Sequence, residues 1–290
     1  MKVLITGTGQ LAQELLRGAP EQLNVVCAGR STLDITEHDQ VFSYIANLSP
    51  HVVINAAAYT AVDKAESEVD MAYAVNERGA RNLAEACKMC DARMLHVSTD
   101  FVFNGEACSP YSPDYLPSPI GVYGASKNAG DLAVRELLPS SSIVVRSSWL
   151  YAATGNNFVI TILRLLSERT ELRVVCDQVG SPTWARSLSE WLWNRVVSDA
   201  SCSGIFHWRD AGVVSWYDFA VVIQELALDK GILIHRIPIF PIPTSDYATA
   251  AARPAYSVLD SSSAEQVSGL QAQPWRQQLS LMLDEVTNLS

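Results

Sequence analysis

The sequence is poor in positive charge and in long apolar runs. Its 290 residues contain 21 Lys and Arg against 31 Asp and Glu, a formal net charge of -10. Binding to phosphate backbones or anionic membranes needs clustered Lys and Arg, so neither nucleic acid nor a membrane is an expected partner. No apolar run approaches the roughly 18 residues that a membrane-spanning helix needs. The opening MKVLITGTGQ turns polar too early for a signal peptide, and a cytoplasmic location is expected.

Cysteine is also scarce and scattered. A chain of this length does not depend on its six cysteines for disulfides, so reduced thiols are expected. The only close pair, Cys87 and Cys90, lies in RNLAEACKMCDAR, which offers neither a second pair nor a histidine for zinc. We therefore expect no metal site. Glu14 and the acidic KAESEVD (64–70) are interpreted as isolated carboxylates on solvated helix faces.

What the chain does contain is an alternation of strand and helix signals. Short apolar, β-branched runs are followed by segments with apolar residues at helical spacing. This order predicts an α/β fold with a doubly wound parallel sheet (Rossmann), whose ligands bind outside the carboxyl ends of the strands. The predicted strands are 2–6, 24–29, 51–58, 93–99 and 142–149, and the predicted helices between them are 9–19, 37–48, 71–90 and 125–138.

The pattern loosens after Trp149. A helix is predicted at 157–169 and a strand at 171–180, and the tryptophan-rich SEWLWNRVV (189–197) is expected to be buried inside the fold. No Gly/Ser or charged linker separates the two halves. We therefore expect a dinucleotide-binding domain at 1–150. Residues 151–290 are expected to form a smaller, interleaved substrate-binding region, with some segments returning to pack on the first domain.

A glycine motif follows the first predicted strand. Gly7, Gly9 and Ala12 have G-x-G-x-x-A spacing at the mouth of the first predicted helix. Gly7 allows a tight turn, Gly9 lets the backbone approach a pyrophosphate, and Ala12 allows close helix packing. In this context the motif predicts a dinucleotide site, although a plain tight turn has the same letters.

The end of the second predicted strand bears on the choice of dinucleotide. A site for NAD usually has a carboxylate there, whereas a site for NADP has a cation. This chain has Gly29, then Arg30 and Ser31, whose guanidinium and hydroxyl could hold a 2′-phosphate. The alternative is a solvated arginine. We expect NADPH, with NADH as the second choice.

Tyr123 and Lys127 stand four residues apart in YGASKNAG, on one face of a helix. A neighbouring ammonium is expected to lower the pKa of the phenol, which would suit it to proton transfer. Upstream, Ser98 and Thr99 end a predicted strand and could hydrogen-bond a carbonyl oxygen. Each pattern alone also fits a solvated helix face or a cap.

Together these motifs resemble the extended short-chain dehydrogenases/reductases that act on sugar nucleotides. More narrowly, the chain resembles the dTDP-4-dehydrorhamnose reductases over nearly its whole length. NAAAYTAVDKAE is the rarest of the shared segments. The quoted similarities are VVINAAAYTAVDKAESE (52–68), HVSTDFVFNG (96–105), VYGASKNAG (122–130), RSSWLYAATGNNFV (146–159), DQVGSPT (177–183) and ARPAYSVLD (252–260).

The resemblance implies roles for individual residues. It makes Thr99, Tyr123 and Lys127 catalytic in the NADPH-dependent reduction of the C4 keto group of dTDP-4-dehydro-L-rhamnose to dTDP-L-rhamnose. It implies substrate contacts by Thr99, Trp149, Asn157 and Arg253, with Arg253 the candidate for the diphosphate. The cofactor residues that it implies are Gly7, Gly9, Gln10, Leu11, Arg30, Ser31, Asp34, Ile35, Ala56, Ala57, Ala58, Tyr59, Tyr123 and Lys127.

Several alternatives stay open. The first loop is one residue shorter than the G-x-x-G-x-x-G typical of the family, so its pyrophosphate contacts can differ. The substrate could be another nucleotide-linked 4-keto-6-deoxy sugar. An epimerase or a dehydratase is a further alternative, although Asp100 is not followed by the glutamate that dehydratases typically carry, which argues against a dehydratase. A non-catalytic regulatory subunit is the remaining alternative for the function. The resemblance also implies a homodimer as a candidate assembly.

Overall fold

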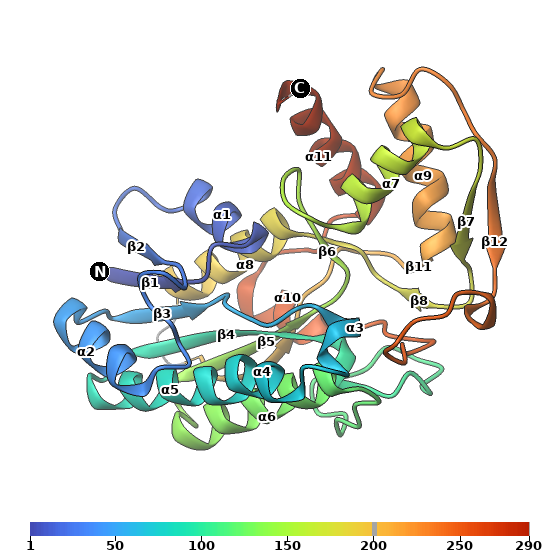
Figure 1. Ribbon diagram of the computed structural model, residues 1–290. Coiled ribbons are helices and arrows are strands. Elements are labelled where there is room, and N and C mark those ends of the chain that lie inside the picture. The colour runs from blue at the N-terminus through green and yellow to red at the C-terminus, as the bar shows by residue number, and fades with distance from the viewer. Residues whose placement is uncertain (199–201, 290) are drawn as a thin grey trace.

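The structure, a computed structural model, describes residues 1–198 and 202–289. A six-stranded sheet forms its centre, in the order β10-β5-β4-β3-β1-β2 (Figure 1). Every neighbouring pair in this sheet is parallel, which confirms the doubly wound α/β prediction. The strands are β1 (Lys2–Thr6), β2 (Asn24–Ala28), β3 (Val52–Asn55), β4 (Arg93–Thr99), β5 (Ser142–Ser147) and β10 (Gly204–His207).

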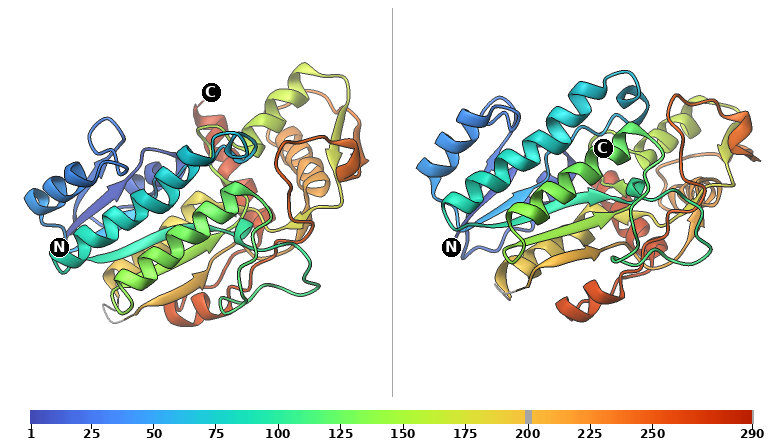
Figure 2. Two further views of the ribbon diagram at one scale, coloured as in Figure 1. Left: turned by 60° about the horizontal axis from the view of Figure 1, so that its bottom comes forward. Right: turned by 90° about the horizontal axis from the view of Figure 1, so that it is seen from below.

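Helices cover both faces of the sheet because alternate strand residues point to opposite sides. In β1, Val3 and Ile5 join the core beneath one helix layer, whereas Leu4 joins the other. Trp191 and Trp193 are buried in the first of these cores, as expected for the tryptophan-rich segment. That layer contains α1 (Gln10–Arg17), α8 (Ala185–Val197) and α10 (Ser262–Ser268); the other contains α2 (His38–Leu48), α5 (Gly79–Met89) and α6 (Val122–Leu137), seen side by side in Figure 2.

The helix predicted at 71–90 is interrupted. It consists of α4 (Val69–Tyr73), a π-helical stretch η1 (Ala74–Arg78) and α5. The buried Asn76 in η1 accepts a hydrogen bond from Tyr59 N and donates one to Ser126 Oγ of α6. The π-turn thus fixes the segment after β3 against α6, as such turns commonly do near functional sites.

A second body forms from the later part of the chain. Its core joins three helices, α7 (Phe158–Glu168), α9 (Trp216–Asp229) and α11 (Trp275–Leu289). Asn157 caps α7 and Ser215 caps α9, so both helices begin where a side chain satisfies free backbone N–H groups. Short strand pairs flank these helices: β7 (Leu172–Val175) with β12 (Ile239–Ile242), β6 (Leu150–Tyr151) with β9 (Thr183–Trp184), and β8 (Val179–Gly180) with β11 (Val214–Ser215).

The two bodies are interleaved in sequence. After β5 the chain builds α7 and β7, then returns to the sheet as α8 and β10, and returns again as α10. The remaining short elements are α3 (Val62–Ala65), η2 (Asp100–Val102) and η3 (Thr244–Asp246). Within the described ranges, no helix is both long and apolar enough to cross a membrane.

Candidate active site

A cavity of about 1170 Å³ opens at the carboxyl edge of the sheet, between the two bodies. Residues just after β1, β2 and β3 and at the ends of β4 and β5 line it, which is where a doubly wound sheet binds ligands. Most of the residues singled out in the sequence meet here. They are Gly7, Gly9, Gln10, Leu11, Arg30, Asp34, Ile35, Ala56, Ala57, Ala58, Tyr59, Thr99, Tyr123, Lys127, Trp149 and Arg253.

The glycine loop has the geometry of a dinucleotide cradle. Gly7 has a φ of 91°, and a Cβ there would lie 3.0 Å from the Ala57 backbone, so a side chain fits neither the conformation nor the space. Gly9 precedes α1, whose first N–H groups have no side-chain cap, and a Cβ on Gly9 would meet nothing within 4 Å. Open space before uncapped N–H groups suits a pyrophosphate. The residues present therefore fit a dinucleotide.

Arg30 lies at the rim of the cavity beyond β2. Its side chain is 71% exposed and its Nε donates to Asp34 Oδ2 at 3.0 Å. Asp34 is held in turn by Thr36, whose backbone N–H and hydroxyl both donate to Oδ1. Ser31 is exposed and does not line the cavity. The guanidinium is thus oriented by a fixed carboxylate while staying open to a ligand.

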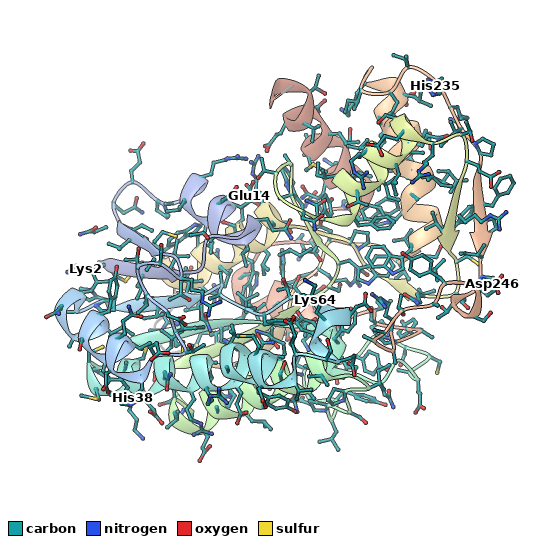
Figure 3. All side chains as sticks on the ribbon, in the orientation of Figure 1. Lys2, Glu14, His38, Lys64, His235 and Asp246 are labelled. Atoms are coloured by element: carbon teal, nitrogen blue, oxygen red, sulfur yellow. The ribbon has the colours of Figure 1, made fainter. Side chains whose placement is uncertain are left out.

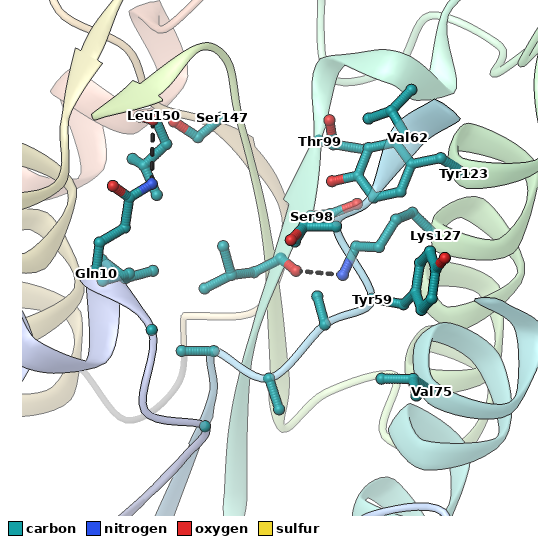
Figure 4. A pocket seen from close by; sticks show the side chains of 18 of the residues that line it. Gln10, Tyr59, Val62, Val75, Ser98, Thr99, Tyr123, Lys127, Ser147 and Leu150 are labelled. Atoms are coloured by element: carbon teal, nitrogen blue, oxygen red, sulfur yellow. Dashed lines mark hydrogen bonds between the residues drawn. The ribbon is translucent and has the colours of Figure 1, made fainter. Parts of the chain in front are cut away.

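Thr99, Tyr123 and Lys127 converge on one side of the cavity (Figure 4). Tyr123 and Lys127 come from the first turns of α6, and Thr99 comes from the end of β4. Thr99 Oγ1 accepts from Phe101 N at 3.2 Å and donates to Asp100 Oδ1 at 3.0 Å. Lys127 is buried, and its Nζ donates to Val97 O at 2.7 Å. The backbone of β4 therefore fixes the ammonium, and the turn η2 (Asp100–Val102) that follows β4 fixes the hydroxyl.

The expected lowering of the Tyr123 pKa is wrong for this structure. Burial raises the pKa of Tyr123 to about 12, and a hydrogen bond with Thr99 offsets only part of that rise. The Lys127 ammonium is directed to the Val97 carbonyl, and burial lowers its own pKa to about 8 while Asp131 acts in the opposite direction. Desolvation disfavours both charged forms, and it exceeds the opposing effects of Thr99 on Tyr123 and of Asp131 on Lys127.

Lys127 lies beside a buried ionic cluster of Asp131, Arg146 and His96. Asp131, one turn along α6, is bound by Arg146 Nε at 3.1 Å. His96 Nε2 lies 3.6 Å from the same carboxyl, and its Nδ1 is 3.0 Å from Asn55 Nδ2. Burial holds the pKa of His96 well below its usual value, so the imidazole is neutral. Arg146 and Lys127 thus balance the Asp131 charge, because an uncompensated buried carboxylate would be costly.

Three candidate substrate residues come from the second half of the chain, namely Trp149, Asn157 and Arg253. Their side chains have different surroundings. Trp149 lines the cavity and stacks on Trp216 with ring centroids 3.4 Å apart. Arg253 also lines it, beside Asp63. Asn157 instead caps α7 through Oδ1 and donates to Ala152 O through Nδ2, and its neighbours Asn156 and Phe158 line the cavity. The side chain of Asn157 is thus engaged by the local backbone and by Gln10, to whose Oε1 its Nδ2 also donates at 3.3 Å.

The interpretation of the acidic residues as solvated is wrong for Glu14 and Glu66, whereas Glu68 and Asp70 are exposed. Glu14 is buried and binds Arg17 and Arg186, both at 3.0 Å. Within 64–70, Glu66 accepts from Val122 N at 2.9 Å and Glu68 accepts from the Tyr59 hydroxyl at 2.7 Å. The helical spacing of these carboxylates was visible in the sequence, but Arg186 and Val122, which engage Glu14 and Glu66, are distant along the chain.

Other residues that line the cavity were not predicted from the sequence. Trp216 and Phe158 form an aromatic wall with Trp149. Ser147 ends β5 at the cavity, and Ser148 follows it. Tryptophan and phenylalanine in helices are typical core residues, so no local signal separates them from packing. Ser147 and Ser148 could have been found from their place after a strand, as Ser98 and Thr99 were.

A parallel sheet with a glycine loop at its first turn, and with a threonine facing Tyr-x-x-x-Lys at its carboxyl edge, defines a short-chain dehydrogenase/reductase. Residues 1–288 match the family described as RmlD substrate binding domain. The chain belongs to this family, that of the dTDP-4-dehydrorhamnose reductases, as the resemblance implied.

Three relatives illustrate the match. A dTDP-4-dehydrorhamnose reductase of Aggregatibacter actinomycetemcomitans is 41% identical, covering 96% of this chain and 97% of that protein. A dTDP-4-keto-6-deoxy-D-glucose reductase of Streptomyces niveus is 38% identical, over 88% and 87%. The crystal structure of dTDP-4-dehydrorhamnose reductase from Bacillus anthracis strain Ames in complex with NADP has a TM-score of 0.91 at 38% identity, covering 98% of this chain and 99% of that one.

Proposed function

We propose that this protein reduces the C4 keto group of dTDP-4-dehydro-L-rhamnose to dTDP-L-rhamnose with NADPH, working in the cytoplasm. Relatives that match this chain over nearly its whole length are named for this activity, and one similar structure was solved in complex with NADP. The observation that carries the proposal is the convergence of Thr99, Tyr123 and Lys127 on the cavity that the glycine loop opens. A regulatory protein without activity would not need that convergence. A homodimer stays a prediction.

The dinucleotide would lie along the carboxyl edge of the sheet. The N–H groups at the start of α1 would hold its pyrophosphate, and Arg30 would hold the 2′-phosphate. Lys127 would bind the nicotinamide ribose. Ser31, which is exposed beside Arg30, is a further candidate for the 2′-phosphate. NADPH supplies the hydride when bound.

The side chains of the protein supply the proton and hold the reacting oxygen. With a pKa raised to about 12, Tyr123 is a neutral phenol at physiological pH and therefore carries the proton to be donated. As negative charge develops on the C4 oxygen, the Tyr123 hydroxyl donates its proton to it. Thr99 would help to hold that oxygen, because its hydroxyl lies beside the phenol. Arg253 would bind the diphosphate, and Trp149 would contact the sugar nucleotide.

A second candidate is reduction of a different 4-keto-6-deoxy sugar nucleotide. The Streptomyces niveus relative favours it, because that protein is named for dTDP-4-keto-6-deoxy-D-glucose and is nearly as similar as the others. The two candidate substrates differ in stereochemistry around the sugar ring. The same Thr99, Tyr123 and Lys127 would serve both, so the choice depends on the substrate half of the cavity.

An assay of NADPH oxidation tests the proposal. Purified protein is given NADPH and dTDP-4-dehydro-L-rhamnose in one cuvette, and dTDP-4-keto-6-deoxy-D-glucose in another. Faster oxidation with the first substrate is the expected result. Preference for the second would replace the leading proposal with the alternative. Cofactor binding without oxidation of NADPH by either substrate would argue against a reductase of these sugars.

A further inference from the structure

TAVDKAE (60–66), the second part of the rare segment NAAAYTAVDKAE, has no part in the mechanism above. It forms the short helix α3, which Figure 3 locates through Lys64 at the junction of the two bodies. The two carboxylates of the motif, Asp63 and Glu66, make contacts with different parts of the chain. One binds the C-terminal half, and the other binds the helix that carries Tyr123.

Both carboxylate oxygens of Asp63 accept hydrogen bonds from Arg253. Arg253 Nη1 donates to Oδ1 at 3.1 Å and Nη2 donates to Oδ2 at 2.7 Å, a forked pair. Oδ1 also accepts from Ala251 N at 3.1 Å, so the same carboxylate holds the backbone beside the arginine. The Arg253 hydrogen bond holds the pKa of Asp63 below its ordinary value, and the carboxylate is therefore charged at neutral pH.

These hydrogen bonds leave one edge of the Arg253 guanidinium available to a ligand. Arginine has five N–H donors. Nη1 uses its two on Asp63 and Ala251 O, and Nη2 uses one on Asp63. Among the described residues, nothing accepts from Nε or from the second Nη2 donor. These two donors form the other fork of the guanidinium, which matches a pair of phosphate oxygens, and Arg253 lines the cavity.

Glu66 holds the start of the catalytic helix. Its Oε1 accepts from Val122 N at 2.9 Å, the first N–H of α6, directly before Tyr123. The residue before the helix, Gly121, has no side chain to cap that end, and a Cβ there would lie 2.9 Å from Glu66 Oε1. The glutamate therefore serves as the cap from a remote segment, with a charge that suits a helix N-terminus.

We propose that α3 is a positioning element with two separable roles. Asp63 presents the free fork of Arg253 to the substrate diphosphate, and Glu66 fixes the first turn of α6 so that the Tyr123 hydroxyl meets the substrate oxygen. The proposal rests on the proposed function of Arg253 and Tyr123. It predicts that Asp63 governs substrate binding and Glu66 governs the chemical step.

The effect of Asp63 on binding has two opposing contributions. Its negative charge weakens the attraction of Arg253 for an anion, but the carboxylate is 46% exposed, so water screens much of that repulsion. Its three hydrogen bonds hold the Arg253 side chain and the 251–253 backbone in place before the substrate arrives. Without them, the conformational entropy of these groups would be lost on substrate binding and would weaken it. The second contribution is the larger, so loss of Asp63 weakens binding.

The test of Asp63 is a steady-state comparison of Asp63→Asn and Asp63→Ala with the full-length protein. The KM for the nucleotide sugar is expected to rise by roughly tenfold in Asp63→Ala and by less in Asp63→Asn, which keeps one acceptor. The kcat and the KM for NADPH stay near their original values. Asp70→Asn, an exposed carboxylate outside the cavity lining, is the matched control for the lost charge. A lowered KM would show that Asp63 competes with the diphosphate and would overturn the proposal.

The test of Glu66 separates alanine from glutamine. Glu66→Ala is expected to lower kcat by roughly tenfold with little change in either KM, because the reacting hydroxyl is displaced. Glu66→Gln keeps an oxygen for Val122 N and is expected to restore kcat to within about twofold. A variant that melts earlier but keeps its kcat would show a merely structural glutamate and overturn this half.

These outcomes are distinct from failure of the proposed function. If the original protein oxidises NADPH with neither sugar nucleotide, the function is wrong before any variant is made. If it is active and binding of dTDP, measured by calorimetry, weakens in Asp63→Ala, the positioning role stands. Unchanged dTDP binding and unchanged KM in an active protein overturn the role of Asp63 alone.

Discussion

The phenol of Tyr123 is a proton donor held in an apolar setting. Its ring packs edge-on against Phe101, with centroids 5.5 Å apart, and its hydroxyl faces Thr99. Burial raises its pKa because phenolate would lose its hydration. A buried neutral phenol keeps its proton until a stronger base appears, and an alkoxide formed at C4 is such a base. The raised pKa is therefore consistent with the proposed donor role.

Tyr123→Phe removes this proton while retaining the ring that packs against Phe101. We expect the rate of NADPH oxidation to fall roughly a hundredfold or more, the usual scale for loss of a general acid. NADPH binding, followed by fluorescence titration, should be nearly unchanged. An unaltered rate would exclude Tyr123 as the donor, and loss of NADPH binding would point to a damaged fold.

Arg30 is predicted to distinguish the two cofactors. Its exposed guanidinium is oriented by Asp34 at the cavity rim, where a 2′-phosphate would lie. Arg30→Ala should raise the KM for NADPH roughly tenfold, the scale of a lost charge-assisted pair, and leave that for NADH almost unchanged. Arg81→Ala, outside the cavity lining, is the control for lost positive charge. Equal losses with both cofactors would place the phosphate elsewhere.

Among the elements, those with a strong local pattern could be predicted from the sequence. The first five strands are β-branched runs, and each is found within a few residues of its predicted position. β10 was not predicted as a sixth strand, because GIFH is short and its place beside β5 depends on pairing with a distant segment. The π-turn η1 also escaped prediction, since Asn76 is fixed by Tyr59 and Ser126 rather than by its own helix. The same limit hid the partners of Asp63 and Glu66.

The junction of β9 with α8 is bound by a carboxyl from the segment after β10, and this carboxyl should make stability depend on pH. Asp210 accepts from Trp184 N at 2.8 Å. Burial raises the pKa of Asp210 to about 7, although the hydrogen bonds from Ser187 and Trp184 N oppose that rise. The folded pKa exceeds the unfolded one, so this stabilisation is complete below about pH 4 and is lost as pH rises towards 7. The shift corresponds to an upper limit of roughly 4 kcal/mol.

Asp210→Asn should abolish that contribution to the pH dependence. Asparagine keeps an acceptor for Trp184 N and cannot ionise. We expect the melting temperature of the variant, relative to the original protein, to rise by several degrees between pH 5 and pH 8, as followed by differential scanning calorimetry. A difference that stays constant over this range would show that Asp210 does not titrate there.

At the scale of the whole molecule, the cavity belongs to both halves of the chain. Gln10 Nε2 donates to Leu150 O, and Thr154 donates to Gln13, so the glycine loop is tied to the segment that leaves the sheet. Arg186 of α8 binds Glu14 of α1. The glycine loop, Thr99 and Tyr123 could be located from local motifs and Arg253 from the family resemblance, whereas Trp216 and Phe158 in the closing wall could not. Long-range contacts build that wall, and a single sequence does not display them.

A fragment of residues 1–150 should not fold alone, although the motifs place a domain boundary there. It lacks β10, which pairs with β5, and α8, whose Trp191 and Trp193 fill the core over one face of the sheet. That face and the β5 edge would be exposed, a state that favours aggregation. We expect the fragment to be insoluble, or to lack a cooperative thermal transition by circular dichroism, under conditions in which the full chain melts cooperatively. A soluble fragment that melts cooperatively and binds NADPH would show instead that residues 1–150 form an independently folding domain, which does not need the later segments.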